Sequence, residues 1–271
     1  MGSRLLTKDL DIAYGQQRIV DHLNIDLPAG RITALVGANG SGKSTILRTM
    51  ARLMRPSGGS VLLDGESIHK QSTREVAKKL AILPQHPLAP DGVTVGELVS
   101  YGRYPHQHGM RRLNAADRRA VGRAIAATEL TELADRPVDS LSGGQRQRAW
   151  IAMALAQETQ WLFLDEPTTY LDMTYQLDVL KLIRRLNREK GRSIVMIVHD
   201  LNQAARFADD LIAIKAGRVV CEGEPRRVIT RAMLAEVFGV EADIFIDRRT
   251  QLPLCIPCDT LPGREQSHEA L

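Results

Sequence analysis

The 271-residue sequence lacks any apolar run long enough to cross a membrane, and its N-terminus lacks a secretory pattern. A transmembrane helix needs about 20 consecutive apolar residues. The apolar runs here, such as the one from Ile194 to Val198, have the length of buried strands. The opening residues, MGSRLLTKDL, do not follow the pattern of a signal peptide. We therefore expect a soluble, cytoplasmic protein that serves a membrane only by docking onto a partner that spans it.

The sequence also has little cysteine and no block of like charge. Its formal net charge is +4, and its basic residues form scattered pairs such as Arg118-Arg119. Because a basic arm that binds nucleic acid needs a longer run, we expect no nucleic-acid partner. Three cysteines fit a reducing compartment. Cys255 and Cys258 form one CxxC without a second pair, which is weak evidence for zinc, and we interpret them as residues without a metal role.

Short apolar runs alternate with helical patterns along most of the chain. Residues 1–30 contain loosely alternating segments that predict strands, and SVLLDGESI predicts a hairpin with its turn at Asp64-Gly65. Four further runs have the character of buried strands, namely RITALVG, LAILPQ, WLFLDEP and SIVMIVHD. Strands that alternate with helices predict an α/β fold with a mainly parallel sheet covered on both faces.

Between His86 and Ser140 the strand signals disappear and charged helical segments replace them, which predicts a helical insert in the α/β core. The C-terminal segment is rich in proline and ends in GREQSHEAL, so we expect it to be loosely ordered. The expected organisation is a single domain over residues 1–247, with a core at 1–85 and 150–247 and a helical subdomain at about 86–149, followed by a C-terminal tail at 248–271.

The segment GANGSGKST places glycine and hydroxyl residues directly after an apolar strand and before a helical pattern. It fits the phosphate-loop pattern GxxxxGK[ST] in the strand–helix context that this pattern requires. Glycines let backbone N–H groups approach phosphate oxygens, and the start of a helix favours an anion. Lys43 supplies a cation for the β- and γ-phosphates, and the Ser44 hydroxyl can ligate Mg²⁺. The residues expected to bind ATP here are Gly37, Asn39, Gly40, Ser41, Gly42, Lys43, Ser44 and Thr45.

Two acids, Asp165 and Glu166, end the strongly apolar strand WLFLDEP. Burying unpaired carboxylates is costly, so a metal-bound phosphate nearby would explain their position. We expect Asp165 to help hold Mg²⁺ and Glu166 to polarise the attacking water. A strand end that reaches solvent is the alternative interpretation.

A second anion-binding helix start is indicated by LSGGQ at Leu141 to Gln145. With this motif the sequence resembles the ATP-binding cassette (ABC) family, and the resemblance extends from about Leu5 to about Gly239. It implies a P-loop NTPase cassette with a mainly parallel RecA-like core sheet. It also implies an N-terminal antiparallel β subdomain and an inserted α-helical subdomain.

The resemblance implies that two copies meet head to tail as a homodimer. ATP then lies between the phosphate loop of one copy and the LSGGQ motif of the other. The motif residues implied to contact this nucleotide are Ser142, Gly143, Gly144 and Gln145. Asp172, in YLD, matches the acid that crosses the interface between the copies.

Three further positions match family residues that surround the nucleotide. Tyr14, in IAYG, matches the aromatic residue that stacks on adenine. Gln85, in ILPQ, matches the glutamine that reaches Mg²⁺ and the attacking water. His199, in IVHD, matches the histidine that contacts the γ-phosphate. Without the resemblance, a lone tyrosine or histidine at a strand end would be interpreted as structural.

Finer similarity is to the ATPase subunits of importers for iron–siderophore, haem and cobalamin complexes, above all ferric-siderophore importers. It rests on YGRYPH, TTYLDMTYQLDVL and HDLNQA. The similarity implies integral-membrane permease subunits as partners and, indirectly, a periplasmic or extracellular substrate-binding protein. It places the chain peripherally on the cytoplasmic face of the bacterial inner membrane. His106 and His108 are interpreted as surface-loop residues, because the iron complex in such systems passes through the permease.

The helical insert is expected to offer the permease a groove for a short helix. Val93, Val95 and Leu98 are candidates to line this groove, and core packing is the alternative for each of them. Two other functions stay open: an ABC exporter subunit, and a soluble cassette protein of DNA repair or translation. Soluble relatives usually carry two cassettes or a long coiled-coil insert, whereas this chain has one cassette and a short insert.

Overall fold

A computed structural model of the chain describes residues 3–107 and 113–261. The strands are β1 (Leu5–Tyr14), β2 (Gln17–Leu23), β3 (Asp26–Leu27), β4 (Ile32–Val36), β5 (Gly58–Leu63), β6 (Glu66–Ser67), β7 (Leu80–Leu83), β8 (Trp161–Leu164), β9 (Ser193–Ile197), β10 (Asp210–Lys215), β11 (Arg218–Gly223), β12 (Val240–Ile246) and β13 (Pro253–Thr260). The α-helices are α1 (Lys43–Met50), α2 (Thr73–Lys79), α3 (Val95–Tyr101), α4 (Ala115–Ala127), α5 (Gly143–Ala156), α6 (Met173–Lys190), α7 (Leu201–Phe207), α8 (Pro225–Val228) and α9 (Arg231–Met233). Shorter turns are η1 (Tyr104–His106), η2 (Thr131–Leu133), η3 (Val138–Ser140) and the π-helical η4 (Leu234–Phe238).

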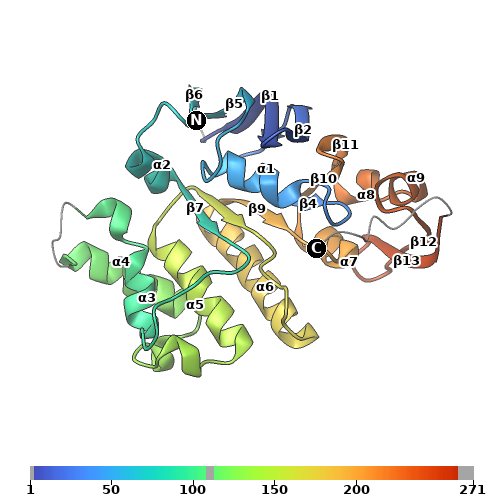
Figure 1. Ribbon diagram of the computed structural model, residues 1–271. Coiled ribbons are helices and arrows are strands. Elements are labelled where there is room, and N and C mark those ends of the chain that lie inside the picture. Colours follow the sequence, from blue (N-terminus) through green and yellow to red (C-terminus); the bar gives the residue numbers. More distant parts are fainter. Residues whose placement is uncertain (1–2, 108–112, 262–271) are drawn as a thin grey trace.

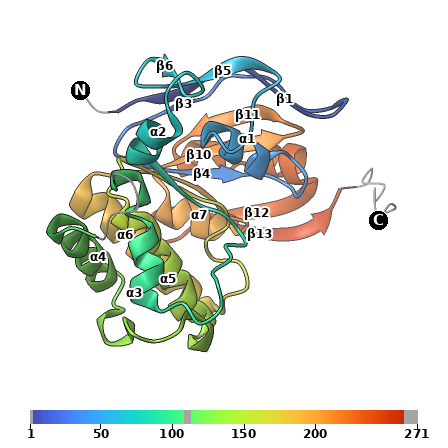
Figure 2. The ribbon, with the colours of Figure 1, turned by 60° about the vertical axis from the view of Figure 1, so that its left-hand side comes forward.

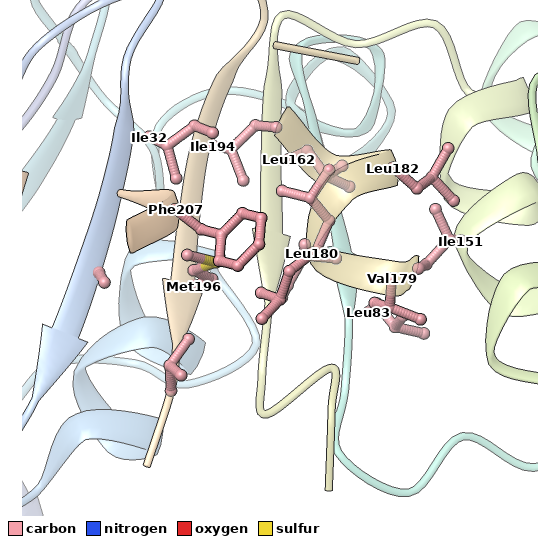
Figure 3. Close-up of a cluster of buried hydrophobic side chains, with 14 of the residues drawn as sticks. Ile32, Leu83, Ile151, Leu162, Val179, Leu180, Leu182, Ile194, Met196 and Phe207 are labelled. Atoms are coloured by element: carbon pink, nitrogen blue, oxygen red, sulfur yellow. The ribbon is translucent and has the colours of Figure 1, made fainter. Parts of the chain in front are cut away.

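The central sheet has the strand order β11-β10-β4-β9-β8-β7, and all neighbouring strands except β10 and β11 are parallel (Figure 1). The side chains of its inner strands point alternately into two hydrophobic cores, one on each face of the sheet. In β9, Ile194 and Met196 lie in the first core, and Val195 and Ile197 lie in the second. Burial on both faces explains why these runs are apolar throughout. Figure 3 shows part of the first core, where the sheet packs against helices α5, α6 and α7.

The second core lies between the central sheet and an antiparallel sheet, which has the order β2-β1-β5-β6 with β3 beside β1. Helix α1 contributes Ile46, Leu47 and Met50 to this core. Trp161 and Phe163 of β8 pack edge to face within it. The predicted hairpin turn at Asp64-Gly65 is confirmed, because β5 pairs with β6 on either side of it.

Helices α3, α4 and α5 pack together beside the central sheet (Figure 2), and α5 extends beyond residue 149, where the helical insert was expected to end. Capping boxes at Thr94 and Asn114 fix the starts of α3 and α4. Val95 and Leu98 are fully buried, so core packing is the correct interpretation for both, and Val93 packs partly buried against the same core.

Crossing a bilayer requires a long apolar helix, and none of the helices in the described part of the chain meets that requirement.

The C-terminal segment contains a hairpin, so the expectation of a loosely ordered tail is wrong for residues 253–260. Strand β13 pairs antiparallel with β12 along its whole length. Pro253 begins the strand and Pro257 lies where the register shifts, and both are positions at which a strand tolerates proline. Cys255 is buried against the first core. His108 and residues 262–271, also part of the sequence predictions, lie outside the described residues.

Candidate functional site

Four parallel strands of the central sheet end at one edge, and predicted site residues follow each of them within two positions. β4 leads into Gly37, β7 into Gln85, β8 into Asp165 and Glu166, and β9 into His199. Because the strands are parallel, their carboxyl ends lie along the same edge of the sheet. The topology therefore gathers side chains that are far apart in the sequence.

The phosphate loop contacts strand β10 and the turn that joins β10 to β11. Gly37 is buried, and a Cβ atom on it would lie 2.2 Å from the carbonyl oxygen of Ile214, so only glycine fits this contact. The N–H of Gly217, in the turn between β10 and β11, donates to the carbonyl of Ser41 at 2.9 Å. These contacts hold the loop backbone in place.

The side chain of Lys43, the first residue of α1, folds back over the loop. Its Nζ donates to the carbonyl oxygens of Gly37 at 2.9 Å and Ala38 at 2.8 Å, and to Ser41 Oγ at 3.3 Å. Burial lowers the pKa of Lys43, although the carboxylates at the end of β8 oppose this shift. The loop therefore presents a partly desolvated cation.

The other predicted loop residues lie at the tip of the loop and in the first turn of α1. Asn39 and Gly40 are exposed at the tip. Gly42 is the N-cap of α1 in the left-handed conformation, and Thr45 is half-buried one turn into the helix. The backbone N–H groups at the start of α1 face this loop, an arrangement that suits an anion.

Asp165 has a fully buried side chain beside the first turn of α1. The Ser44 hydroxyl donates to Asp165 Oδ1 at 2.9 Å, and Arg48 Nε lies 3.4 Å from Oδ2. Among the described residues, none makes a hydrogen bond of good geometry to Oδ2. Burial raises the pKa of Asp165, and the hydrogen bond from Ser44 partly offsets this. A hydroxyl next to a buried carboxylate with a spare oxygen is a donor set that fits Mg²⁺.

Three side chains contact the carboxylate oxygens of Glu166. His199 Nε2 lies 2.7 Å from Oε1. Gln85 Nε2 and Thr169 Oγ1 donate to Oε2 at 2.5 Å and 3.0 Å. The backbone of Glu166 has a φ of 55°, a left-handed conformation that non-glycine residues rarely adopt. Backbone strain and three contacts together define the direction of this carboxylate.

The LSGGQ motif forms the start of α5. Ser142 is its N-cap and makes a capping box with Gln145, because Ser142 Oγ accepts from the Gln145 N–H at 3.3 Å and Gln145 Oε1 accepts from the Ser142 N–H at 3.1 Å. Gly144 packs against the ring of Tyr175, where a Cβ atom would lie 2.4 Å from Cδ1. Ser142 and Gly143 are exposed. The N-terminus of α5 is therefore accessible to solvent at Ser142 and Gly143.

The protein-family model of the ABC transporter family matches residues 20–169, which is more than half of the chain. The chain belongs to the ABC transporter family. It is 54% identical to the iron(3+)-hydroxamate import ATP-binding protein of Bacillus subtilis (strain 168), over 97% of each chain.

Two solved structures extend the comparison. One is a metal-chelate type ABC transporter in an inward-facing conformation, with a TM-score of 0.82, 29% identity, and coverage of 95% of this chain and 98% of the other. The second is a dimeric post-hydrolysis ATP-binding cassette bound to ADP and phosphate, with a TM-score of 0.70, 28% identity, and coverage of 81% and 98%.

The predicted site residues of this ABC cassette form two groups. One group is joined by direct contacts and contains the phosphate loop, Asp165, Glu166, Gln85 and His199. The other contains the LSGGQ motif and the segment before α6. There Asp172 caps α6 by accepting from the N–H of Tyr175 at 3.1 Å, and a Cβ atom on Gly143 would touch Leu171.

Tyr14 belongs to neither group in the described structure. It lies at the end of β1 with about half of its surface exposed, and its hydroxyl donates to the sulfur of Met54 at 3.1 Å. Its ring is therefore accessible for stacking.

Two residues that contact the site were missed by the sequence analysis. Arg48 approaches Asp165 from one turn further along α1, and Thr169 reaches Glu166 from three residues downstream. The spacing of Ser44 and Arg48, four residues apart, places both on one face of a helix and could have indicated the first contact. The second depends on a turn that no motif describes.

Proposed function

We propose that this cassette is the ATP-hydrolysing subunit of an importer for iron–siderophore complexes, or for haem or cobalamin. The observation that carries the ATPase assignment is the carboxylate of Glu166, held by His199 and Gln85 beside the Ser44–Asp165 pair. The similarity to the Bacillus subtilis iron(3+)-hydroxamate import protein supports the substrate class. The likeness to a metal-chelate type transporter supports it further.

ATP binding is assigned to the phosphate loop and to Tyr14. The loop N–H groups and Lys43 bind the phosphates, and the Tyr14 ring stacks on adenine. Ser44, Asp165 and Gln85 would hold Mg²⁺. When bound there, the ion would supply positive charge against the charge that develops on the phosphate oxygens.

Hydrolysis of the γ-phosphate depends mainly on positioning and charge neutralisation. Glu166 orients and polarises the attacking water as the general base. His199 contacts the γ-phosphate, and its hydrogen bond to Glu166 keeps the two side chains adjacent. Gln85 orients the water from the side of β7.

A second copy of the chain completes each nucleotide site in this proposal. The start of α5, where Ser142 and Gly143 are exposed, contacts the γ-phosphate bound by the other copy through the motif residues Ser142 to Gln145. Asp172 lies at the start of α6 beside this motif and crosses the interface. ATP then draws the two copies together, and hydrolysis releases them.

The partners follow from the importer assignment. Permease subunits span the membrane, and a periplasmic or extracellular binding protein delivers the chelate to them. The cassettes lie on the cytoplasmic face of the bacterial inner membrane. The ATPase domain expected at residues 1–247 also includes strand β13, which pairs with β12. Its helical subdomain, at about residues 86–149, passes the movement of the cassette to the permease.

Complementation of a deletion strain tests this proposal. The wild-type gene is expected to restore growth and radioactive-iron uptake when a ferric hydroxamate is the only iron source. Glu166→Gln is expected to restore neither, and its ATPase rate falls by about 10²–10⁴-fold because the general base is lost. The purified variant still binds ATP and accumulates as a closed dimer.

The exposed residue Glu189, near the end of α6, provides the control. Glu189→Gln keeps both growth and hydrolysis. A full ATPase rate in Glu166→Gln would exclude this residue as the base. The proposed substrate class would be excluded if the deletion strain grew as well as the wild type on a ferric hydroxamate, on haem and on cobalamin.

A further inference from the structure

The segment that follows the end of β8 turns back on the carboxylate of Glu166. The N–H of Thr169 donates to the carbonyl of Glu166 at 3.3 Å, so residues 166–169 form a β-turn. Pro167 occupies the second position of this turn, where its fixed φ is favourable. The turn formed by the sequence Glu-Pro-Thr-Thr therefore places Thr169 close to Glu166.

This turn brings a hydroxyl group to the acid. Thr169 Oγ1 donates to Glu166 Oε2 at 3.0 Å, and both side chains are partly buried. A hydrogen bond to an ionised acceptor is stronger than one between neutral groups, and screening by water is reduced at a partly buried site. The hydroxyl therefore restrains the rotation of the carboxylate.

The other two contacts of Glu166 come from different strands. Gln85 follows β7 and His199 follows β9, and the proposed function assigns both to the nucleotide, the metal ion and the water. When these two side chains engage the nucleotide, their bonds to Glu166 compete with the new contacts. Thr169 lies on the same turn as Glu166 and moves with it.

We propose that Thr169 is a positioning residue for hydrolysis, which holds the Glu166 carboxylate in the direction that the attacking water requires. The inference rests on the proposed function, because it assumes that Glu166 is the base. Thr169 itself does not contact the phosphates in this account. Its effect falls on the rate of the chemical step and not on nucleotide binding.

The substitution Thr169→Val tests this role, because valine keeps the shape of threonine and removes the hydroxyl. In the full-length protein with Mg²⁺ and ATP, kcat is expected to fall by about ten- to a hundredfold, which is the effect of losing one hydrogen bond to a charged group. The ATP dissociation constant stays within error of the wild type. Thr169→Ser, which retains the hydroxyl, restores most of the rate.

A double-mutant cycle shows whether the hydroxyl acts through Glu166. In the Glu166→Gln background, adding Thr169→Val is expected to change the residual single-turnover rate by less than about twofold, since the group that it positions is absent. An unchanged kcat in Thr169→Val, or a full additional loss in the double variant, overturns the inference. A loss of ATP affinity equal to the loss of kcat overturns it too.

The two proposals can fail separately. If the wild-type protein does not hydrolyse ATP under any of these conditions, the proposed function fails. If the wild type hydrolyses ATP and Thr169→Val matches it, the proposed function stands and the positioning role alone fails.

Discussion

The side chain of Asp165, which directly follows β8, is fully buried and contacts Ser44 and Arg48 of α1. Its Oδ1 accepts from Ser44, whereas the described residues offer no well-oriented donor to its Oδ2. Burying a carboxylate without full hydrogen bonding is unfavourable. The nucleotide-free protein therefore gives up stability at the place where the proposed function needs a ligand for a metal ion.

Replacement of Asp165 by asparagine is predicted to stabilise the nucleotide-free protein and to abolish Mg²⁺-dependent hydrolysis. The pKa of Asp165 is raised in the folded state by burial. Between the unfolded and folded pKa values the native state binds more protons, so stability falls as pH rises through this window and the cost persists at neutral pH. Asp165→Asn removes that cost, and the free energy of unfolding at neutral pH rises by about 1 kcal/mol.

Urea unfolding of both proteins at several pH values measures this effect. The gain should disappear at a pH low enough to protonate Asp165. Asp178→Asn, at an exposed position of α6, is the matched control and should change stability little. A less stable Asp165→Asn protein at neutral pH would contradict the account of this site.

At the level of single residues, the sequence predicted best those positions at which backbone geometry and chemistry require the same residue type. The phosphate loop could be predicted because its glycines and lysine must occur at fixed spacing. Thr169 could not be predicted, since a hydroxyl residue in a turn has many ordinary roles. The left-handed backbone of Glu166 was also not foreseeable, because glutamate is not among the residue types that favour this conformation.

At the scale of elements, the C-terminal hairpin is joined to the helix that follows His199. The Asn202 side chain, in the first turn of α7, donates from Nδ2 to the Cys255 carbonyl at 3.1 Å and accepts the Cys255 N–H on Oδ1 at 2.8 Å. One amide thus binds the backbone of β13 twice, as a neighbouring strand would. Asp200 fixes the start of the same helix by accepting from the N–H groups of Asn202 and Gln203.

Removal of this amide is predicted to loosen the hairpin. Asn202→Leu leaves the N–H and carbonyl of Cys255 without their partners, which costs about 1–3 kcal/mol. Hydrogen exchange of the β13 amides should accelerate, since the strand opens more often from α7. Gln203→Ala is the control, because the Gln203 side chain donates its hydrogen bond to Gln176 and, within the described part of the chain, makes none to the hairpin. Unchanged exchange in Asn202→Leu would show that the hairpin is held by its apolar contacts alone.

The elements that the sequence revealed are those with a strong apolar pattern. The strands β4, β7, β8 and β9 were predicted because both of their faces are buried. The hairpin of β12 and β13 was missed, since its two prolines and partly exposed faces weaken the alternation that indicates a strand. Short helices such as α2 and α8 were also missed, because one or two turns give little periodicity.

At the scale of the whole molecule, one chain carries two helix starts that are predicted to bind anions, and they do not contact each other in the described structure. The start of α1 lies beside the buried Asp165, which accepts a hydrogen bond from Ser44, whereas the start of α5 is exposed. A single copy therefore offers the phosphate loop of one site and the LSGGQ motif of another. Two copies related by a twofold axis can complete both sites with the same pair of surfaces.

Mixing two inactive variants tests this arrangement directly. Lys43→Ala removes the phosphate contact of one surface, and Ser142→Arg blocks the other, so neither variant alone forms an intact site. In a dimer of one copy of each, the phosphate loop of the Ser142→Arg chain meets the LSGGQ motif of the Lys43→Ala chain, and one site is complete. The shared-site account predicts that an equimolar mixture hydrolyses ATP at roughly a quarter of the wild-type rate, because about half of the dimers are mixed and each has one of two sites. A rate equal only to the average of the two separate variants would contradict it.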